Sequence, residues 1–178
     1  MKRIVFVLLF LLFFTIAMPS LAQEVVPTPT PVDYTLAYPG ILPDNPLYKI
    51  KAFRDWLISI LIADSLKKAE FDILQADKRL GAAQDLFEEN PPKAALAVET
   101  LSKGENYFFS AIAQMKQAKI QGESLYDTLQ KLRLSNAKHL EIVLQLEQGQ
   151  TGNILKGLRQ QEQRIRGFGK TVVAEGAH

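Results

Sequence analysis

Histidine is the side chain most suited to catalysis or metal binding near neutral pH, and this sequence contains only two, His139 and His178. There is no cysteine, which excludes disulfides and thiolate metal sites. Neither the two Glu-x-x-His motifs that a di-iron bundle needs nor an H-E-x-x-H motif occurs. Because no second histidine or cysteine can join His139, we interpret it as a residue at the edge of an apolar helix face, and we predict no metal site.

Other catalytic or cofactor chemistries have equally little support. Met115 and His139 could together ligate haem, but Met115 falls among small residues of a predicted helix contact, so we predict a core residue and no cofactor. No serine stands in a nucleophile-elbow motif, and residues 169–173, GKTVV, lack the glycine spacing of a phosphate loop. We therefore predict no catalytic residue and no enzyme. A hydrolase with an unrecognised carboxylate pair is kept as an alternative.

The N-terminus has the three parts of a secretory signal. Lys2 and Arg3 precede an apolar run over residues 4–18, and Ser20-Leu21-Ala22 supplies small residues for cleavage. We predict a signal peptide over residues 1–22 and a secreted or extracytoplasmic chain that starts at Gln23. The alternative is a membrane anchor through residues 4–18, although a span needs roughly 20 residues.

Export removes the basic excess of the chain. The whole sequence carries 21 Lys and Arg against 19 Asp and Glu, and loss of Lys2 and Arg3 makes these numbers equal. A neutral chain gives no support to nucleic-acid binding, so we predict none. Proline alternates with threonine over residues 27–31, and we predict an extended linker over residues 23–38. One domain over residues 39–170 and a flexible tail over 171–178 are predicted to follow.

The domain is predicted to open with a helix-start motif. Asp44 or Asn45 is expected to cap the first helix, and Pro46 is expected at its first position. Apolar residues then recur at helical spacing and predict an inward face, while Leu42 and Tyr48 are expected to pack back onto the bundle. The motif comprises Leu42, Pro43, Asp44, Pro46, Leu47 and Tyr48, and the inward face Leu47, Ile50, Phe53 and Leu57.

Residues 42–51, LPDNPLYKIK, resemble the opening of a family of bacterial extracytoplasmic helical domains of unknown function. Members of that family often begin with the pattern LP-D/G-x-P-L/F-Y-x-hydrophobic-K, where x is any residue. They continue as an Ala-rich helical hairpin. Residues 76–107 are similar to that hairpin, so the resemblance covers roughly residues 39–120. Some relatives are ectodomains of membrane-bound regulators. The resemblance implies an extracytoplasmic location and a helical fold, but no activity.

The hairpin also follows from spacing alone. Small residues recur every seven positions in two segments separated by Asn90-Pro91-Pro92, which predicts two long antiparallel helices in close contact rather than a tetratricopeptide pair. Two further apolar faces follow, so the fold class is all-α: an antiparallel bundle of about five helices with a long Ala-rich central hairpin. The predicted seam comprises Ala69, Ala76, Ala83, Ala97, Gly104, Ala111 and Ala118.

Two segments are candidates for binding partners. Residues 56–63, WLISILIA, are apolar almost all round a helix, which favours central burial, with a partner or membrane surface as the alternative. Arg159, Arg164 and Arg166 form a basic region that could contact anionic lipid or wall polymer, or be an ordinary solvated face. The leading hypothesis is a non-enzymatic secreted bundle that binds an unknown protein, an envelope component or itself. The alternatives are a small-ligand or cofactor carrier and the hydrolase.

Overall fold

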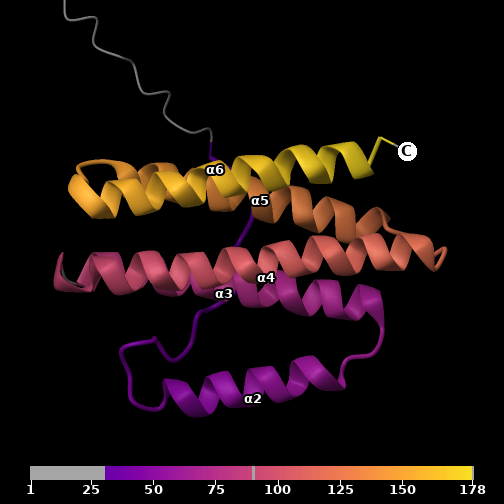
Figure 1. The fold of residues 1–178 in the computed structure, drawn as a ribbon, viewed down its shortest axis with the longest axis horizontal. Helices are drawn as coiled ribbons and strands as arrows, with labels where there is room; N and C mark the ends of the chain where they lie inside the picture. Colours follow the sequence, from indigo (N-terminus) through magenta and orange to yellow (C-terminus); the bar gives the residue numbers. More distant parts are fainter. Residues whose placement is uncertain (1–30, 90, 178) are drawn as a thin grey trace, which may run out of the picture.

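The described part of this computed structural model, residues 31–89 and 91–177, is built from helices and connecting segments without a strand. The elements are α2 (Tyr48–Leu61), α3 (Ser65–Glu89), a 3-10 turn η1 (Pro91–Lys93), α4 (Ala94–Ile120), α5 (Tyr126–Glu147) and α6 (Gly152–Glu175). Helices α3 to α6 run alongside one another, and α2 lies on the outer side of α3 (Figure 1). The predicted all-α bundle is confirmed. The predicted signal peptide lies outside the described residues.

Helices α3 and α4 make the most extensive helix contact, and small residues form it. A Cβ atom built on Gly104 would lie only 3.3 Å from the carbonyl oxygen of Ala76, so the two backbones approach closely there. Asp64 caps the start of α3, because its Oδ1 accepts a 2.8 Å hydrogen bond from the amide of Lys67. All seven predicted seam residues are buried: Ala69, Ala76, Ala83, Ala97, Gly104, Ala111 and Ala118.

The last helix is longer than predicted. Helix α6 continues to Glu175 and Val172 is fully buried, so the expected flexible tail from residue 171 is wrong. Gly169 does not end the helix. Its lack of a side chain instead makes room for α5, since a Cβ atom there would lie 2.7 Å from Nδ2 of Asn136. A glycine inside a helix can thus mark a close approach rather than a stop.

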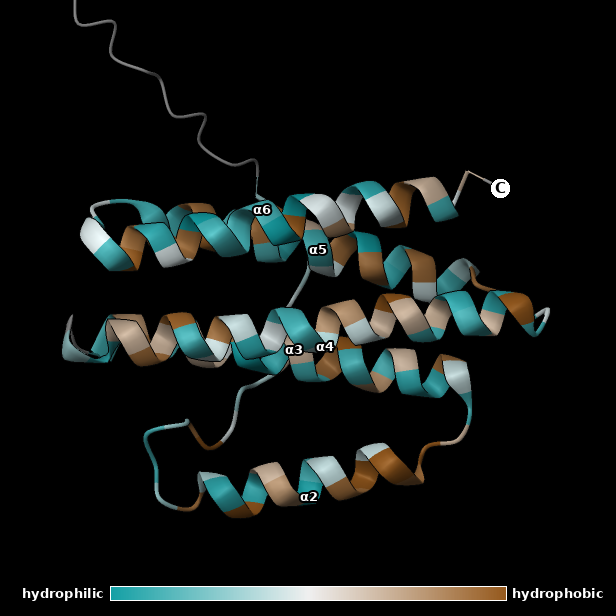
Figure 2. Ribbon diagram, viewed as in Figure 1, coloured by the Kyte–Doolittle hydropathy of each residue, from teal (hydrophilic) through white to brown (hydrophobic). Residues whose placement is uncertain are grey.

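Helix α2 is oriented opposite to the prediction. Its one buried residue is Asp55, while the apolar side chains expected to face the bundle are exposed. Residues 56–63 are therefore not a central helix, and in Figure 2 the brown C-terminal half of α2 lies at the outer edge of the fold. The exposed large apolar residues of this helix and the residue before it are Leu47, Ile50, Phe53, Trp56, Leu57, Ile58, Ile60 and Leu61, here called the α2 apolar face.

The opening motif is a turn rather than the start of the helix itself. Helix α2 begins at Tyr48, two residues after Pro46. The expected cap is wrong for both Asp44 and Asn45, because Leu47 precedes the helix and no side chain caps it, while Oδ1 of Asn45 accepts a 2.9 Å hydrogen bond from the amide of Leu47 within the turn. Asp44 instead forms a 2.8 Å ion pair with Lys93 at the start of α4. Leu42, Pro43 and Tyr48 are half-buried, and Pro46 and Leu47 are exposed.

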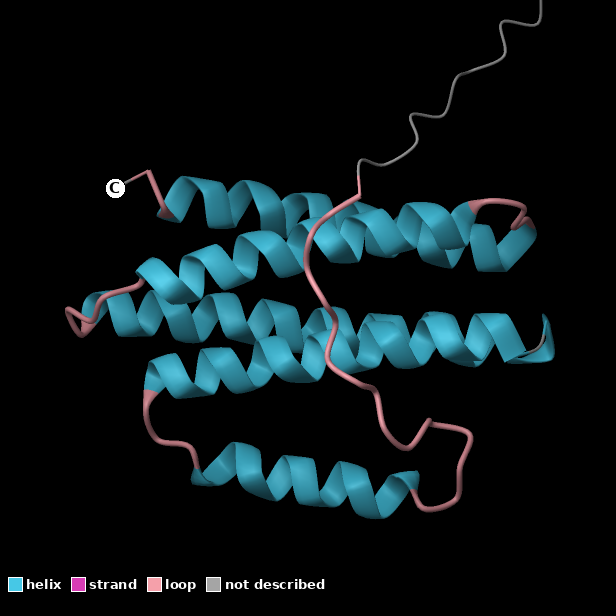
Figure 3. Ribbon diagram, turned by 180° about the vertical axis from the view of Figure 1, so that it is seen from behind, coloured by secondary structure: helices cyan, strands magenta, loops and turns pink. Residues whose placement is uncertain are grey.

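Residues 31–40, here called the strap, cross the bundle on the side seen in Figure 3. Val32, Tyr34 and Leu36 are half-buried, while Pro31, Asp33 and Thr35 between them are exposed. Leu36 packs against the core formed by α3, α4, α5 and α6. The described end of the predicted linker, residues 31–38, is therefore part of the folded domain.

Candidate functional site

A layer of buried polar side chains divides the hydrophobic core into two parts. On α3 the apolar core stops at Ala76 and resumes at Leu80, and Asp77 fills the gap. On α4 it is interrupted in the same way between Leu101 and Phe108, where Glu105 is fully buried. Helix α5 contributes Ser135 and His139, both 0% exposed, to the same level. The layer thus joins α3, α4 and α5 by polar contacts.

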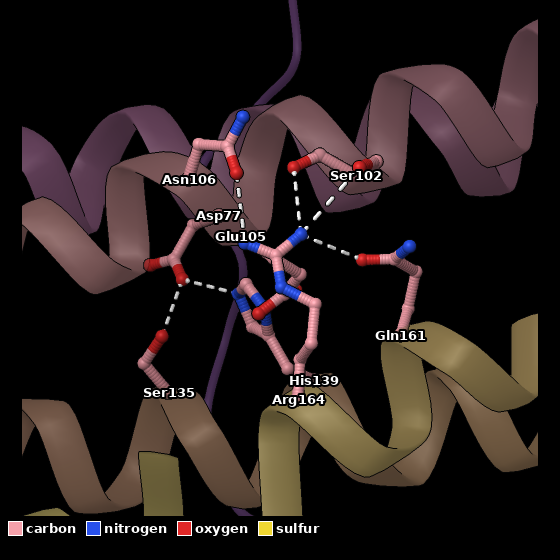
Figure 4. Close-up of polar contacts among 8 residues, drawn as sticks. All are labelled: Asp77, Ser102, Glu105, Asn106, Ser135, His139, Gln161 and Arg164. Atoms are coloured by element: carbon pink, nitrogen blue, oxygen red, sulfur yellow. Dashed lines mark hydrogen bonds and ion pairs between the residues drawn. The ribbon is translucent and has the colours of Figure 1, made fainter. Parts of the chain in front are cut away.

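His139 is the centre of this polar layer. Its Nδ1 lies 2.8 Å from Oε1 of Glu105, and its Nε2 lies 3.1 Å from Oδ1 of Asp77 (Figure 4). Burial by itself would lower the pKa of His139, but the two carboxylates outweigh it and raise that pKa to about 9. A charged imidazolium donates one hydrogen bond to each carboxylate. The interpretation of His139 as a residue at the edge of an apolar face is therefore wrong.

Asp77 accepts further hydrogen bonds from two hydroxyl groups. Ser135 donates to Oδ1 at 2.6 Å, and Tyr34 of the strap donates to Oδ2 at 2.6 Å. Burial would raise the pKa of Asp77, but the bonds from His139, Ser135 and Tyr34 lower it overall. Burial and the neighbouring Asp77 raise the pKa of Tyr34, so its hydroxyl keeps its proton. The strap is thus tied to the polar layer by one buried hydrogen bond.

A second contact holds the end of the strap. The amide of Val32 donates a 2.7 Å hydrogen bond to Oε2 of Glu141, a buried residue of α5. Lys138 lies 3.0 Å from the other oxygen of that carboxylate. Burial would raise the pKa of Glu141, but the Val32 amide and Lys138 lower it overall. The strap is therefore fixed to α3 and α5 together.

The polar layer is enclosed, which limits its chemistry. Both nitrogens of His139 face carboxylates, and within residues 31–89 and 91–177 no group of three or more metal-ligating side chains is placed to hold a metal ion. The open hollow of about 420 Å³ beside α2 and that of about 440 Å³ on α6 are lined by other residues. Buried charge clusters can fix the register of packed helices, and we expect this structural role for the layer.

The three arginines predicted as a partner surface are not equivalent. Arg164 is engaged within the bundle, where its guanidinium donates to Asn106, Gln161 and Ser102 (Figure 4). Arg166 is exposed and pairs with Glu162 at 2.7 Å. Arg159 is exposed and lines the hollow on α6.

The α2 apolar face gathers eight exposed large apolar residues on one helix and the residue before it. Helix α2 faces α3 with its polar side, where Tyr48, Ala52 and Asp55 line a small enclosed space together with Gln75 and Arg79. Arg79 donates to the hydroxyl of Tyr48, and its guanidinium lies 5.8 Å from the centre of that ring. With 3.6 residues per turn, the polar contact places the apolar side chains on the opposite side of the helix, toward solvent. No described helix is both long and apolar enough to cross a bilayer.

A family described as a domain of unknown function, DUF5667, matches residues 40–162. The chain belongs to this family. The expected membership of a family of unknown function is confirmed, and the match extends beyond the residues 39–120 on which the resemblance rested. The DUF5667 match includes α2 and the polar layer, whereas Val32 and Tyr34 of the strap precede it. No curated protein and no solved structure matches the chain.

Asp77, Glu105, Ser135 and the strap were not predicted from sequence motifs, although α5 and the strap each show a pattern. On α5, the buried apolar residues Leu132 and Val143 are separated by several turns. Ser135 and His139 lie between them at helical spacing, so that the successive steps are three, four and four residues. Residues 32–36, VDYTL, alternate apolar and polar side chains, which is typical of an extended segment with one buried side. Interruptions of this kind in an apolar stripe can therefore indicate a buried polar cluster.

Proposed function

We propose that this DUF5667 protein is an exported, non-enzymatic helical bundle of the bacterial cell envelope, which binds an envelope component through the α2 apolar face. The basic start, the apolar run over residues 4–18 and Ser20-Leu21-Ala22 support export. The family resemblance of residues 42–51 supports an extracytoplasmic location.

The exposure of the α2 apolar face carries the proposal. Ile50 is 68% exposed, Phe53 62% and Leu61 74%. Full burial of a side chain of this size contributes roughly 1.5–3 kcal/mol, so a partner that covers several of them gains substantial free energy. Contiguous apolar surface on a folded protein marks an interaction site more often than scattered single residues do.

The polar layer favours an interaction role over the two alternatives. A hydrolase with a carboxylate pair needs one carboxyl with a raised pKa in an open cleft. Asp77 instead has a lowered pKa and is 3% exposed. A ligand carrier needs a cavity in the bundle core, whereas the seam of α3 and α4 is filled by packed side chains. These observations support a structural role for the layer.

The test compares binding to isolated envelope by matched variants. The purified chain from Gln23 onward keeps every described residue and lacks residues 4–18. Phe53→Glu changes the α2 apolar face, and Phe109→Glu changes a phenylalanine of α4 that is also 62% exposed. We expect Phe53→Glu to weaken binding to sedimented envelope about tenfold or more, and Phe109→Glu to bind like the unchanged chain. Equal binding by all three proteins would contradict the proposal.

A further inference from the structure

We propose that the α2 apolar face lies on a bilayer surface that contains anionic lipid. This inference rests on the proposed function and names the envelope component. Helix α2 has 14 residues, about 21 Å at 1.5 Å per residue, which is too short for a hydrocarbon core of about 30 Å. A short helix with a broad apolar side and flanking basic residues lies in the plane of the interface.

The exposed charged residues of α2 itself are basic. Lys49 and Arg54 are exposed, whereas the one acidic residue of α2, Asp55, is 4% exposed and pairs with Arg54 at 2.7 Å. Two copies packed through this face would bring the cations of one near those of the other, which disfavours a second copy as occupant. A bilayer that contains anionic lipid is apolar inside and negatively charged at its surface. It therefore matches both the apolar side chains of the face and the basic residues of the same helix.

A hollow next to the face fits a lipid headgroup. Its volume is about 420 Å³, and it lies between the strap and the first turns of α2. Lys51, Arg54 and Lys78 line it together with Ile41 and Ile50. A phosphate group could therefore contact cations while the adjoining acyl chain contacts apolar side chains.

The positive charges in this hollow are only partly compensated. Burial is the largest effect that lowers the pKa of Lys51, and the nearby Lys78, Arg79 and Arg54 lower it further, against the opposing effect of Asp55. The ammonium group of Lys51 donates to the carbonyl oxygens of Pro39 and Ile41 at 2.5 and 3.2 Å. An anion in the hollow would stabilise this crowded set of cations.

The aromatic residues of α2 match an interfacial position. Trp56 is 54% exposed, and its ring centre lies 5.6 Å from that of Phe53. Tryptophan is enriched at the boundary between headgroups and acyl chains because its ring is apolar and its N–H group is polar. Trp56 is the only tryptophan of the chain, so its fluorescence reports on this face alone.

The experiment measures Trp56 fluorescence of the full chain with vesicles of brominated phosphatidylcholine, either alone or with about one third phosphatidylglycerol. We expect a blue shift and bromine quenching with the anionic vesicles, both reduced by salt. Lys51→Gln and Lys78→Gln should each weaken the effect about fivefold, and Lys131→Gln, an exposed lysine of α5, should not. Residues 4–18 can attach the chain to vesicles, but attachment alone does not bring Trp56 into contact with bromine.

Three outcomes would overturn the inference. The first is unchanged Trp56 emission on vesicle-bound protein, and the second is equal quenching with and without phosphatidylglycerol. The third is a blue shift that depends on protein concentration without lipid, which would assign the face to a second copy. If Phe53→Glu still loses envelope binding in any of these cases, the lipid inference fails while the proposed function stands. If Phe53→Glu also binds envelope normally, both fail.

Discussion

His139 on α5 lies 2.8 Å from Glu105 on α4, and both side chains are fully buried. Removal of Glu105 leaves His139 paired with Asp77 but takes the hydrogen-bond partner from its buried Nδ1–H group, which typically costs roughly 1–3 kcal/mol. We therefore expect Glu105→Ala to lower the free energy of unfolding by about that amount, measured by urea denaturation. Glu99→Ala removes a glutamate of α4 that forms a surface ion pair with Lys103, and should change it by no more than about 1 kcal/mol. A similar small loss in both variants would contradict the assigned role of the layer.

The stability of the fold should fall as the pH rises above neutrality. The pKa of His139 is raised from 6.5 to about 9 in the folded chain. The stabilisation is complete below pH 6.5, where the folded and unfolded chains both hold the proton. Between about pH 6.5 and 9 only the folded chain retains it, so the free energy of unfolding should decrease by up to about 1.4 kcal/mol per pH unit.

Urea denaturation at a series of pH values from about 6 to 9.5 tests this pH dependence. His139→Leu serves as the control, because it removes the titrating group and should reduce the slope. Constant or rising stability of the unchanged chain over this range would show that His139 is not held charged between Asp77 and Glu105.

The strap should contribute measurably to stability through Tyr34. Tyr34→Phe removes a 2.6 Å hydrogen bond to the buried Asp77 and should cost roughly 1–3 kcal/mol. Tyr38→Phe is the matched control, because Tyr38 is 83% exposed and should tolerate the change. Thermal unfolding measures both, and equal midpoints for the two variants would argue that the strap is not fixed on the bundle.

The seam between α3 and α4 should not accept a larger side chain at Ala76. Ala76 is fully buried, and Gly104 of α4 lies against its carbonyl group. Ala76→Leu should therefore cost roughly 1–3 kcal/mol through overpacking. Ala113→Leu is the control, because Ala113 is exposed on α4. Thermal midpoints that are the same for both leucine variants would contradict the close approach.

The sequence predicted the parts of the fold that depend on local periodicity. Alanines at sevenfold spacing identified the hairpin, because this signal lies within two neighbouring helices. The polar layer could not be derived in this way. His139, Asp77 and Glu105 come from three helices, and each is adequately explained as a surface residue until the helices are placed together.

Helix α2 shows why apolar periodicity alone does not determine burial. Its spacing predicts an amphipathic helix correctly, but the side that faces α3 carries the buried Asp55 and Tyr48, whose hydroxyl accepts a hydrogen bond from Arg79. If a partner covers the apolar side of α2, these side chains are buried in the complex, although they are exposed in the single chain.

The most direct measurement of the central claim is chemical labelling of the α2 apolar face with and without envelope. The sequence contains no cysteine, so Phe53→Cys and Phe109→Cys each provide a single reactive thiol at a site that is 62% exposed in the unchanged chain. Both should react rapidly with a maleimide in the purified chain from Gln23 onward. On bound envelope, we predict strong protection of the Phe53→Cys thiol and continued reaction of the Phe109→Cys thiol. Protection of the Phe53→Cys thiol in the free chain, or equal reaction of both variants on bound envelope, would contradict the account.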